Sequence, residues 1–215
     1  MKAVIFDFDY TLGDSSRGIE LSINYALKNM GYSVKGTEDI KRTIGLSLKE
    51  TFFVLTSNDN LEDVKQFSKL FKEKADMVMV ENTVLYPSVK DVLKKLRLMG
   101  YKISIVTTKF HYRIEQILKK FDAVDLIDVI VGAEDVKVEK PNPEGLLFAI
   151  NQLKTNKQDV LYVGDSIVDA KTAENAGVNF AAVLTGTTDI CQLKKHSNVY
   201  IGENISDICD YILHS

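Results

Sequence analysis

The stretch Ala3-Val4-Ile5-Phe6-Asp7-Phe8-Asp9-Tyr10-Thr11-Leu12 decides how the rest of the sequence is interpreted. Its apolar residues predict a strand over 2–8 that is buried on both faces. The strand runs into two carboxylates, Asp7 and Asp9, spaced i, i+2. Buried carboxylates destabilise a fold by several kcal/mol unless a cation or another group compensates them. The pair therefore indicates a metal site or a reaction at the end of this strand.

The composition excludes several classes of protein. The chain has 215 residues, of which 45% are hydrophobic and 27% charged, and its net charge is −3. These values are typical of a globular protein with one large domain or a domain with an insert. They give no argument for nucleic acid or a membrane as partner, and no apolar run reaches the roughly 20 residues that span a bilayer. No signal-peptide pattern precedes the first strand, so we expect a cytoplasmic protein with Cys191 and Cys209 as reduced thiols.

After residue 15 the sequence has two kinds of pattern. Apolar residues at helical spacing predict helices over 16–30, 37–45, 47–57 and 61–80, with no strand signal between them. From residue 86 onward strand and helix patterns alternate. The strands are predicted at 102–107, 127–131, 159–163, 179–184 and 198–201, and the helices at 88–99, 111–121, 143–154, 167–176, 188–194 and 204–213.

This alternation predicts an α/β fold, a Rossmann-like parallel sheet with helices on both faces. We expect residues 1–14 and 84–215 to form this core. Residues 15–83 are expected to form an α-helical cap domain inserted after the first strand.

Reactive side chains follow several of the predicted strands. In parallel sheets ligands bind beyond the carboxyl ends of the strands, so these side chains are expected at one edge. Carboxylates, hydroxyls and a lysine suit a hard divalent cation next to a phosphoryl group. The residues are Asp7 and Asp9 after the first strand, Thr107 and Thr108 after the second, Lys140 in the loop after the third, and Asp165, Ser166 and Asp169 after the fourth.

These residues resemble the four motifs of the haloacid dehalogenase superfamily, in the family's order. The motifs are Asp7-Phe8-Asp9-Tyr10-Thr11-Leu12, Thr107, Lys140-Pro141-Asn142-Pro143 and Gly164-Asp165-Ser166-Ile167-Val168-Asp169. The helical insert, with Arg42-Thr43-Ile44-Gly45-Leu46-Ser47, is similar to the cap of the phosphoglycolate phosphatase-like branch. The resemblance covers the whole chain. It implies a Mg²⁺-dependent phosphatase that hydrolyses a small phosphomonoester such as phosphoglycolate.

The resemblance also implies a role for each motif residue. Asp7 is the expected nucleophile that forms an aspartyl-phosphate, and Asp9 the expected general acid and base. Mg²⁺ is expected to bind carboxylate oxygens of Asp7 and Asp165 and the backbone carbonyl of Asp9. Thr107 and Lys140, with Thr108 nearby, are the expected phosphate binders.

Other charged residues near the motifs have less direct interpretations. Asp169 is expected behind the metal site, holding Lys140 or a metal-bound water, or it is simply an acid in the first turn of a helix. Ser166 is expected near it, as a cap of the same helix or near substrate. Lys137 and Lys109 are rivals to Lys140, and a solvated surface charge is the simpler interpretation of both. His111 at a helix start is more simply a surface residue.

Tyr10 departs from the family pattern, which usually has glycine at this position. A tyrosine there is expected to narrow the pocket or to stack on a substrate. In the cap, Arg42 is a candidate for binding a substrate carboxylate or second phosphate, as are Arg17 and Lys49. Exposed helix charges are the alternative interpretation of these three residues.

Several functions on the same core stay open at this stage. One is a β-phosphoglucomutase-like phosphotransferase, and another is a pyrophosphatase or nucleotidase. A non-catalytic phospho-acceptor like a receiver domain is disfavoured by the helical insert, and no P-loop motif is present. We expect a small phosphorylated metabolite as partner, and a monomer or a homodimer.

Overall fold

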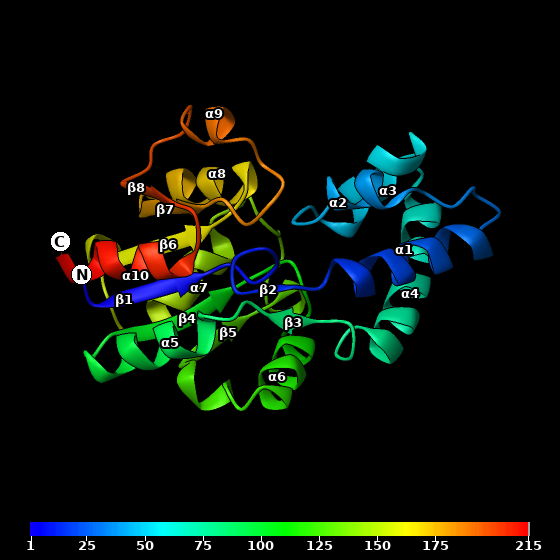
Figure 1. Ribbon diagram of the computed structural model, residues 1–215. Helices are drawn as coiled ribbons and strands as arrows, with labels where there is room; N and C mark the ends of the chain where they lie inside the picture. The colour runs from blue at the N-terminus through cyan, green and yellow to red at the C-terminus, as the bar shows by residue number, and fades with distance from the viewer. Residues whose placement is uncertain (215) are drawn as a thin grey trace. The chain divides into compact units, whose positions relative to one another are not determined.

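The computed structural model describes residues 1–214 and contains a six-stranded sheet with helices on both faces (Figure 1). Neighbouring strands are parallel throughout the sheet. This architecture confirms the predicted α/β class. The strands, in sheet order, are β5 (Val129–Val131), β4 (Lys102–Val106), β1 (Ala3–Phe6), β6 (Val160–Gly164), β7 (Asn179–Val183) and β8 (Tyr200–Gly202).

β1 lies between β4 and β6, and its register brings three strand ends level with one another. Phe6 is paired with Ile105 on one side and with Val163 on the other. The strand ends at Phe6, two residues earlier than predicted. The chain turns directly afterwards, because the Phe8 carbonyl accepts hydrogen bonds from the N–H groups of Leu12 and Gly13, at 2.9 and 3.1 Å.

The helices of the sheet domain form two layers (Figure 1). On one face α5 (Val89–Leu98) packs against β4 and against α10 (Ile205–His214), which also contacts β7 and β8. On the other face α7 (Glu144–Gln152) and α8 (Ile167–Ala176) pack together. α6 (His111–Lys120) contacts β5, and α9 (Ile190–Leu193) contacts α8. Residues 1–214 also contain three short 3₁₀ helices, which are η1 (Val124–Leu126), η2 (Ala133–Asp135) and η3 (Lys157–Asp159).

The regular secondary structure of segment 15–83 is all helical, as the sequence predicts. It consists of α1 (Ser16–Asn29), α2 (Thr37–Lys41), α3 (Leu48–Thr56) and α4 (Leu61–Val78), with α1 and α3 packed on α4. α2 ends four residues before the predicted boundary. The Thr43 hydroxyl donates to the Ile40 carbonyl at 2.7 Å and Gly45 has φ +94°, so the backbone leaves the helix there.

By backbone contacts the chain forms two compact units, Asp14–Val84 and the remainder. Where the chain passes between them, β2 (Gly13–Asp14) pairs with β3 (Val84–Leu85). The sequence did not predict these strands, because two residues are too few to show a period. Within residues 1–214 no helix has the length and apolar character needed to cross a membrane.

We expect Phe52→Ala to destabilise the helical unit by about 3–5 kcal/mol, because it removes a buried aromatic ring. The Phe52 ring contacts Tyr32 edge-on at 5.6 Å and Phe67 at 5.0 Å, between centroids, and its residue is 0% exposed. The matched control is Phe53→Ala on the same helix, since Phe53 is 51% exposed. Denaturant unfolding of both variants measures the difference, and equal losses would contradict this packing.

Candidate active site

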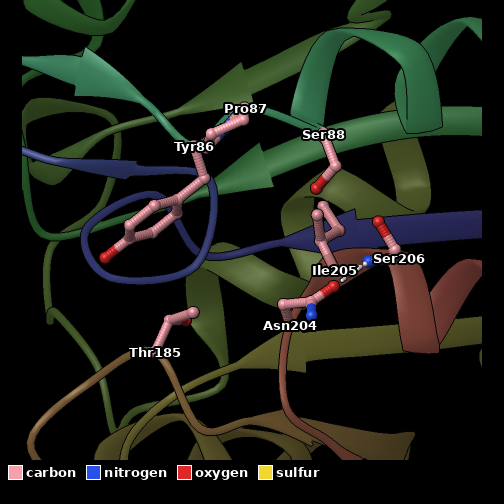
Figure 2. Close-up of a pocket in the computed structure, with 7 residues that line it drawn as sticks. All are labelled: Tyr86, Pro87, Ser88, Thr185, Asn204, Ile205 and Ser206. Carbon is pink, nitrogen blue, oxygen red and sulfur yellow. Dashed lines mark hydrogen bonds between the residues drawn. The ribbon is translucent and has the colours of Figure 1, made fainter.

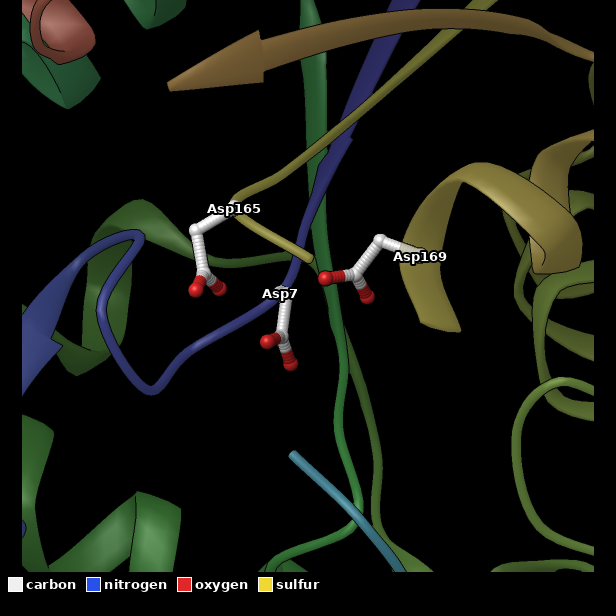
Figure 3. Close-up of side chains that lie close together, drawn as sticks. All are labelled: Asp7, Asp165 and Asp169. Atoms are coloured by element: carbon white, nitrogen blue, oxygen red, sulfur yellow. The ribbon is translucent and has the colours of Figure 1, made fainter. Parts of the chain in front are cut away.

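Three buried carboxylates meet at the carboxyl edge of the sheet (Figure 3). Asp7 follows β1, Asp165 follows β6 and Asp169 lies in the first turn of α8. One oxygen from each lies within 4.8 Å of the others. Such proximity of three acids requires a compensating positive charge.

Lys140 supplies part of that charge. Its Nζ atom lies 2.8 Å from Oδ1 of Asp7 and 2.7 Å from Oδ1 of Asp169. It also donates to the Tyr162 hydroxyl at 3.2 Å, and that hydroxyl donates to Asp169 at 2.8 Å. The sequence did not single out Tyr162, because it lies within the apolar run of β6 and has the pattern of a core residue.

Asp169 uses both of its oxygens within the protein. Oδ1 accepts from Lys140 and Tyr162. Oδ2 accepts from the Ser166 hydroxyl at 2.6 Å and from its N–H at 3.2 Å, while the Asp169 N–H donates to Ser166 Oγ. This is a capping box at the start of α8. The arrangement supports an indirect role for Asp169 and a capping role for Ser166.

Asp165 is held by close packing. A Cβ atom on Gly186, in the loop after β7, would lie 1.9 Å from its Oδ2. The Thr11 hydroxyl lies 3.5 Å from its Oδ1, at the outer limit of a hydrogen bond. Asp165 therefore occupies a position that only a glycine at residue 186 allows, with an oxygen within 4.8 Å of one from Asp7.

Burial dominates the electrostatics of these groups. It raises the pKa of Asp7 to about 7 against the opposing effect of Lys140, and Asp169 adds to the rise. It also raises the pKa of Asp165 well above its usual range, with contributions from Asp169 and Asp7. For Lys140 burial acts to lower the pKa, but the two carboxylates outweigh it and hold that pKa well above the usual range.

The donor set fits a hard divalent cation. Asp7 and Asp165 offer carboxylate oxygens, the ligands that Mg²⁺ prefers, and Asp169 supports Lys140 beside them. Three carboxylates and one lysine leave a net negative charge in this buried cluster. A cation between Asp7 and Asp165 would offset the remaining charge.

Asp9 has a different ionic partner. Its Oδ2 lies 3.1 Å from Nζ of Lys109, with side chains 8% and 5% exposed. The expectation of a solvated charge at Lys109 is therefore wrong. The reason is local, because the loop between β4 and α6 turns back, and the Lys109 N–H donates to Thr107 Oγ at 3.2 Å. Lys137 is exposed, and its N–H donates to Glu144.

Thr107 lies buried at the end of β4, where its N–H donates to the Val131 carbonyl at 3.0 Å. Its Oγ is the acceptor in the bond from Lys109, so its own proton is suited to donation to a phosphoryl oxygen. Thr108 follows and is half-buried. His111 pairs instead with Asp135, 2.9 Å from its Nδ1.

Tyr10 is buried and has φ +59°, the left-handed conformation that glycine adopts most easily. This explains why glycine suits the position.

The candidate substrate-binding residues of the helical unit lie on its surface. Arg42 is exposed at the end of α2, and Lys49 is exposed on α3. Arg17 pairs with Glu20 at 3.5 Å. Their roles remain predictions.

Residues 4–183 match the family described as haloacid dehalogenase-like hydrolase. The chain belongs to this family. It is 31% identical to a protein named pyrophosphatase PpaX from Bacillus pumilus, over 97% of this chain and 94% of that protein. It is 30% identical to a phosphoglycolate phosphatase of Salmonella typhimurium, over 82% of this chain and 79% of that protein. A solved haloacid dehalogenase-like hydrolase from Bacteroides fragilis is 40% identical, with TM-score 0.94 and coverage of 96% and 99%.

We expect Asp7→Asn to stabilise the metal-free protein at pH 8 more than at pH 5. The folded-state pKa of Asp7, about 7, exceeds the ordinary 3.8, so the folded state binds more protons between these values. Its contribution to the free energy of unfolding therefore falls by a few kcal/mol as the pH rises from about 4 to 7. Unfolding in EDTA at both pH values measures the difference between variant and parent.

Asp159→Asn is the control for this experiment. The Lys2 hydrogen bond lowers the pKa of Asp159, so its stabilising effect is present throughout pH 5–8 and is lost only under more acidic conditions. The difference in free energy of unfolding between Asp159→Asn and the parent should therefore be the same at pH 5 and pH 8. If the Asp7→Asn difference is also constant, the carboxyl is not held in a raised-pKa environment.

Proposed function

We propose that this protein is a Mg²⁺-dependent phosphatase that cleaves a small phosphorylated metabolite through an aspartyl-phosphate on Asp7. The observation that carries the proposal is the contact of 2.8 Å between Asp7 and Lys140 in a cluster with Asp165. It combines a nucleophilic carboxylate, a fixed positive charge and oxygen ligands for a cation. Phosphoryl transfer depends on positioning and charge compensation of this kind.

In the first step an Asp7 oxygen forms a bond to phosphorus while the bond to the leaving oxygen breaks. Asp9 donates a proton to that leaving oxygen. In the second step water attacks phosphorus, Asp9 takes its proton, and the bond between Asp7 and phosphorus breaks, which releases phosphate. When bound, Mg²⁺ would offset negative charge on the phosphoryl oxygens.

The remaining residues assist these steps. Lys140 lies against Asp7 and is placed to compensate charge that grows on the phosphoryl group. Thr107 is proposed to donate its hydroxyl proton to a phosphoryl oxygen, with Thr108 beside it. Asp169 and Ser166 fix Lys140 and the start of α8.

Two substrate classes have support. A small phosphomonoester such as phosphoglycolate follows from the cap resemblance and from a relative named for that activity. Pyrophosphate is the second candidate, because relatives named pyrophosphatase match 97% of the chain. Tyr10 and Arg42 are the proposed specificity residues in both cases. Side-by-side kcat/KM values for phosphoglycolate, pyrophosphate and a hexose phosphate separate these, and an isomerised sugar phosphate would instead indicate a mutase.

Asp7→Asn should lower turnover of p-nitrophenyl phosphate by at least about 10³-fold, because the nucleophile is lost. Asp9→Asn should also turn over p-nitrophenyl phosphate slowly, but it should accumulate phosphorylated protein. The reason is that no carboxylate at residue 9 then takes the proton from the water that attacks the aspartyl-phosphate. Intact-protein mass spectrometry after an acid quench detects the adduct. The control is Asp159→Asn, because Asp159 pairs with Lys2 and not with a residue of the cluster. Appreciable turnover by Asp7→Asn would remove Asp7 as nucleophile.

Chelation by EDTA should abolish turnover, and added Mg²⁺ should restore it, because two buried carboxylates then regain their cation. Asp165→Asn should raise the Mg²⁺ concentration for half-maximal activity by about tenfold or more. A titration of activity with Mg²⁺ measures both effects. Activity that is indifferent to EDTA would exclude the proposed role of the cation.

A further inference from the structure

The loop after β7 contributes two residues to the site, and neither belongs to the four motifs. The Thr185 hydroxyl donates a hydrogen bond to the backbone carbonyl of Tyr10. The next residue, Gly186, lies directly against Asp165 and leaves no space for a Cβ atom. One short loop therefore contacts both the turn that follows Asp9 and the acid that follows β6.

The turn after Asp9 needs such contacts. A residue other than glycine in the left-handed region costs roughly 1–2 kcal/mol, and Tyr10 has φ +59°. Such a conformation persists only where the surroundings hold it. The Tyr10 N–H donates to the Gly13 carbonyl at 2.7 Å, which fixes one side of the residue. The bond from Thr185 fixes the other side, because it holds the peptide that joins Tyr10 to Thr11.

We propose that Thr185 is a positioning residue, which acts through the Tyr10 carbonyl to set the path of the chain between Asp9 and Thr11. The inference rests on the proposed function, in which Asp9 transfers the proton. Asp9 immediately precedes Tyr10, and the Thr11 hydroxyl lies 3.5 Å from Asp165. A rotation of the Tyr10–Thr11 peptide therefore displaces groups on both sides of the reaction centre.

A cleft of about 370 Å³ lies beside Thr185 (Figure 2). Its walls include Thr185 and Tyr86, and the turn after Asp9 passes between these two residues. The Tyr86 N–H donates to the Leu12 carbonyl at 3.1 Å. Two hydrogen bonds thus attach the turn to the walls of the cleft. Tyr86 holds the Leu12 carbonyl, and Thr185 holds the Tyr10 carbonyl. The Thr185 bond is the one made by a side chain, so substitution can remove it without changing the backbone.

Three variants test the inference. Thr185→Val keeps the shape and removes the hydroxyl, so kcat for p-nitrophenyl phosphate should fall about tenfold while KM stays within about twofold. Thr185→Ser keeps the hydroxyl and should restore most of kcat. Thr172→Val is the matched control, because it removes a similar 2.7 Å bond from a buried hydroxyl to the Val168 carbonyl within α8. Its kcat should equal that of the parent.

Amide hydrogen exchange of residues 9–13 in EDTA is a second readout that does not require activity. Thr185→Val should increase exchange there, whereas Thr172→Val should not. Should Thr185→Val fail to fold, Thr185→Ala serves for both readouts. A parent without phosphatase activity contradicts the proposed function alone, and exchange then still decides the positioning role. The inference is overturned if Thr185→Val leaves the exchange of residues 9–13 or the kcat of an active parent unchanged. It is also overturned if Thr185→Ser loses as much kcat as Thr185→Val.

Discussion

The rest of the site depends on one buried ionic contact, the Lys140 ammonium between Asp7 and Asp169. Charges that leave water must be compensated by close partners, and one lysine among three carboxylates compensates them only in part. Burial first, and then repulsion between the carboxylates, raises the pKa values of Asp7 and Asp165. In the proposed function Mg²⁺ would offset this remaining charge, so the cost of burial and the proposed chemistry have the same origin.

The parallel sheet brings together residues of the site that are far apart in the sequence. Thr11 and Asp165 are 154 positions apart in the sequence, yet they meet because β1 and β6 are neighbours in register. The close packing at this edge depends on small residues. A Cβ atom on Gly164 would lie 2.4 Å from the Asp169 carboxyl carbon, and one on Gly186 would meet Asp165. The glycines therefore determine how close the acids come to the ends of the strands.

Much of this could be predicted from the sequence, since strand ends that carry acids, a threonine and a lysine are visible as local patterns. The rest is tertiary. Lys109 has the same charge as the exposed Lys137, and only the fold shows that it is buried against Asp9. Tyr162 has the pattern of a core residue because its neighbours in β6 are apolar. Thr185 carries no charge, so the end of β7 drew no attention, although the rule that ligands bind at strand ends applies to it equally.

Tyr10 and Thr185 show why a departure from a motif is informative. The backbone at residue 10 has a conformation that glycine adopts at little cost, and this chain keeps the conformation with a tyrosine. The strain has to be balanced by contacts, and one of them comes from a residue 175 positions away. A mismatch in one motif thus identifies a position where the backbone must be held. The group that holds it lies outside every motif, because backbone carbonyls accept hydrogen bonds from any donor that the fold places beside them.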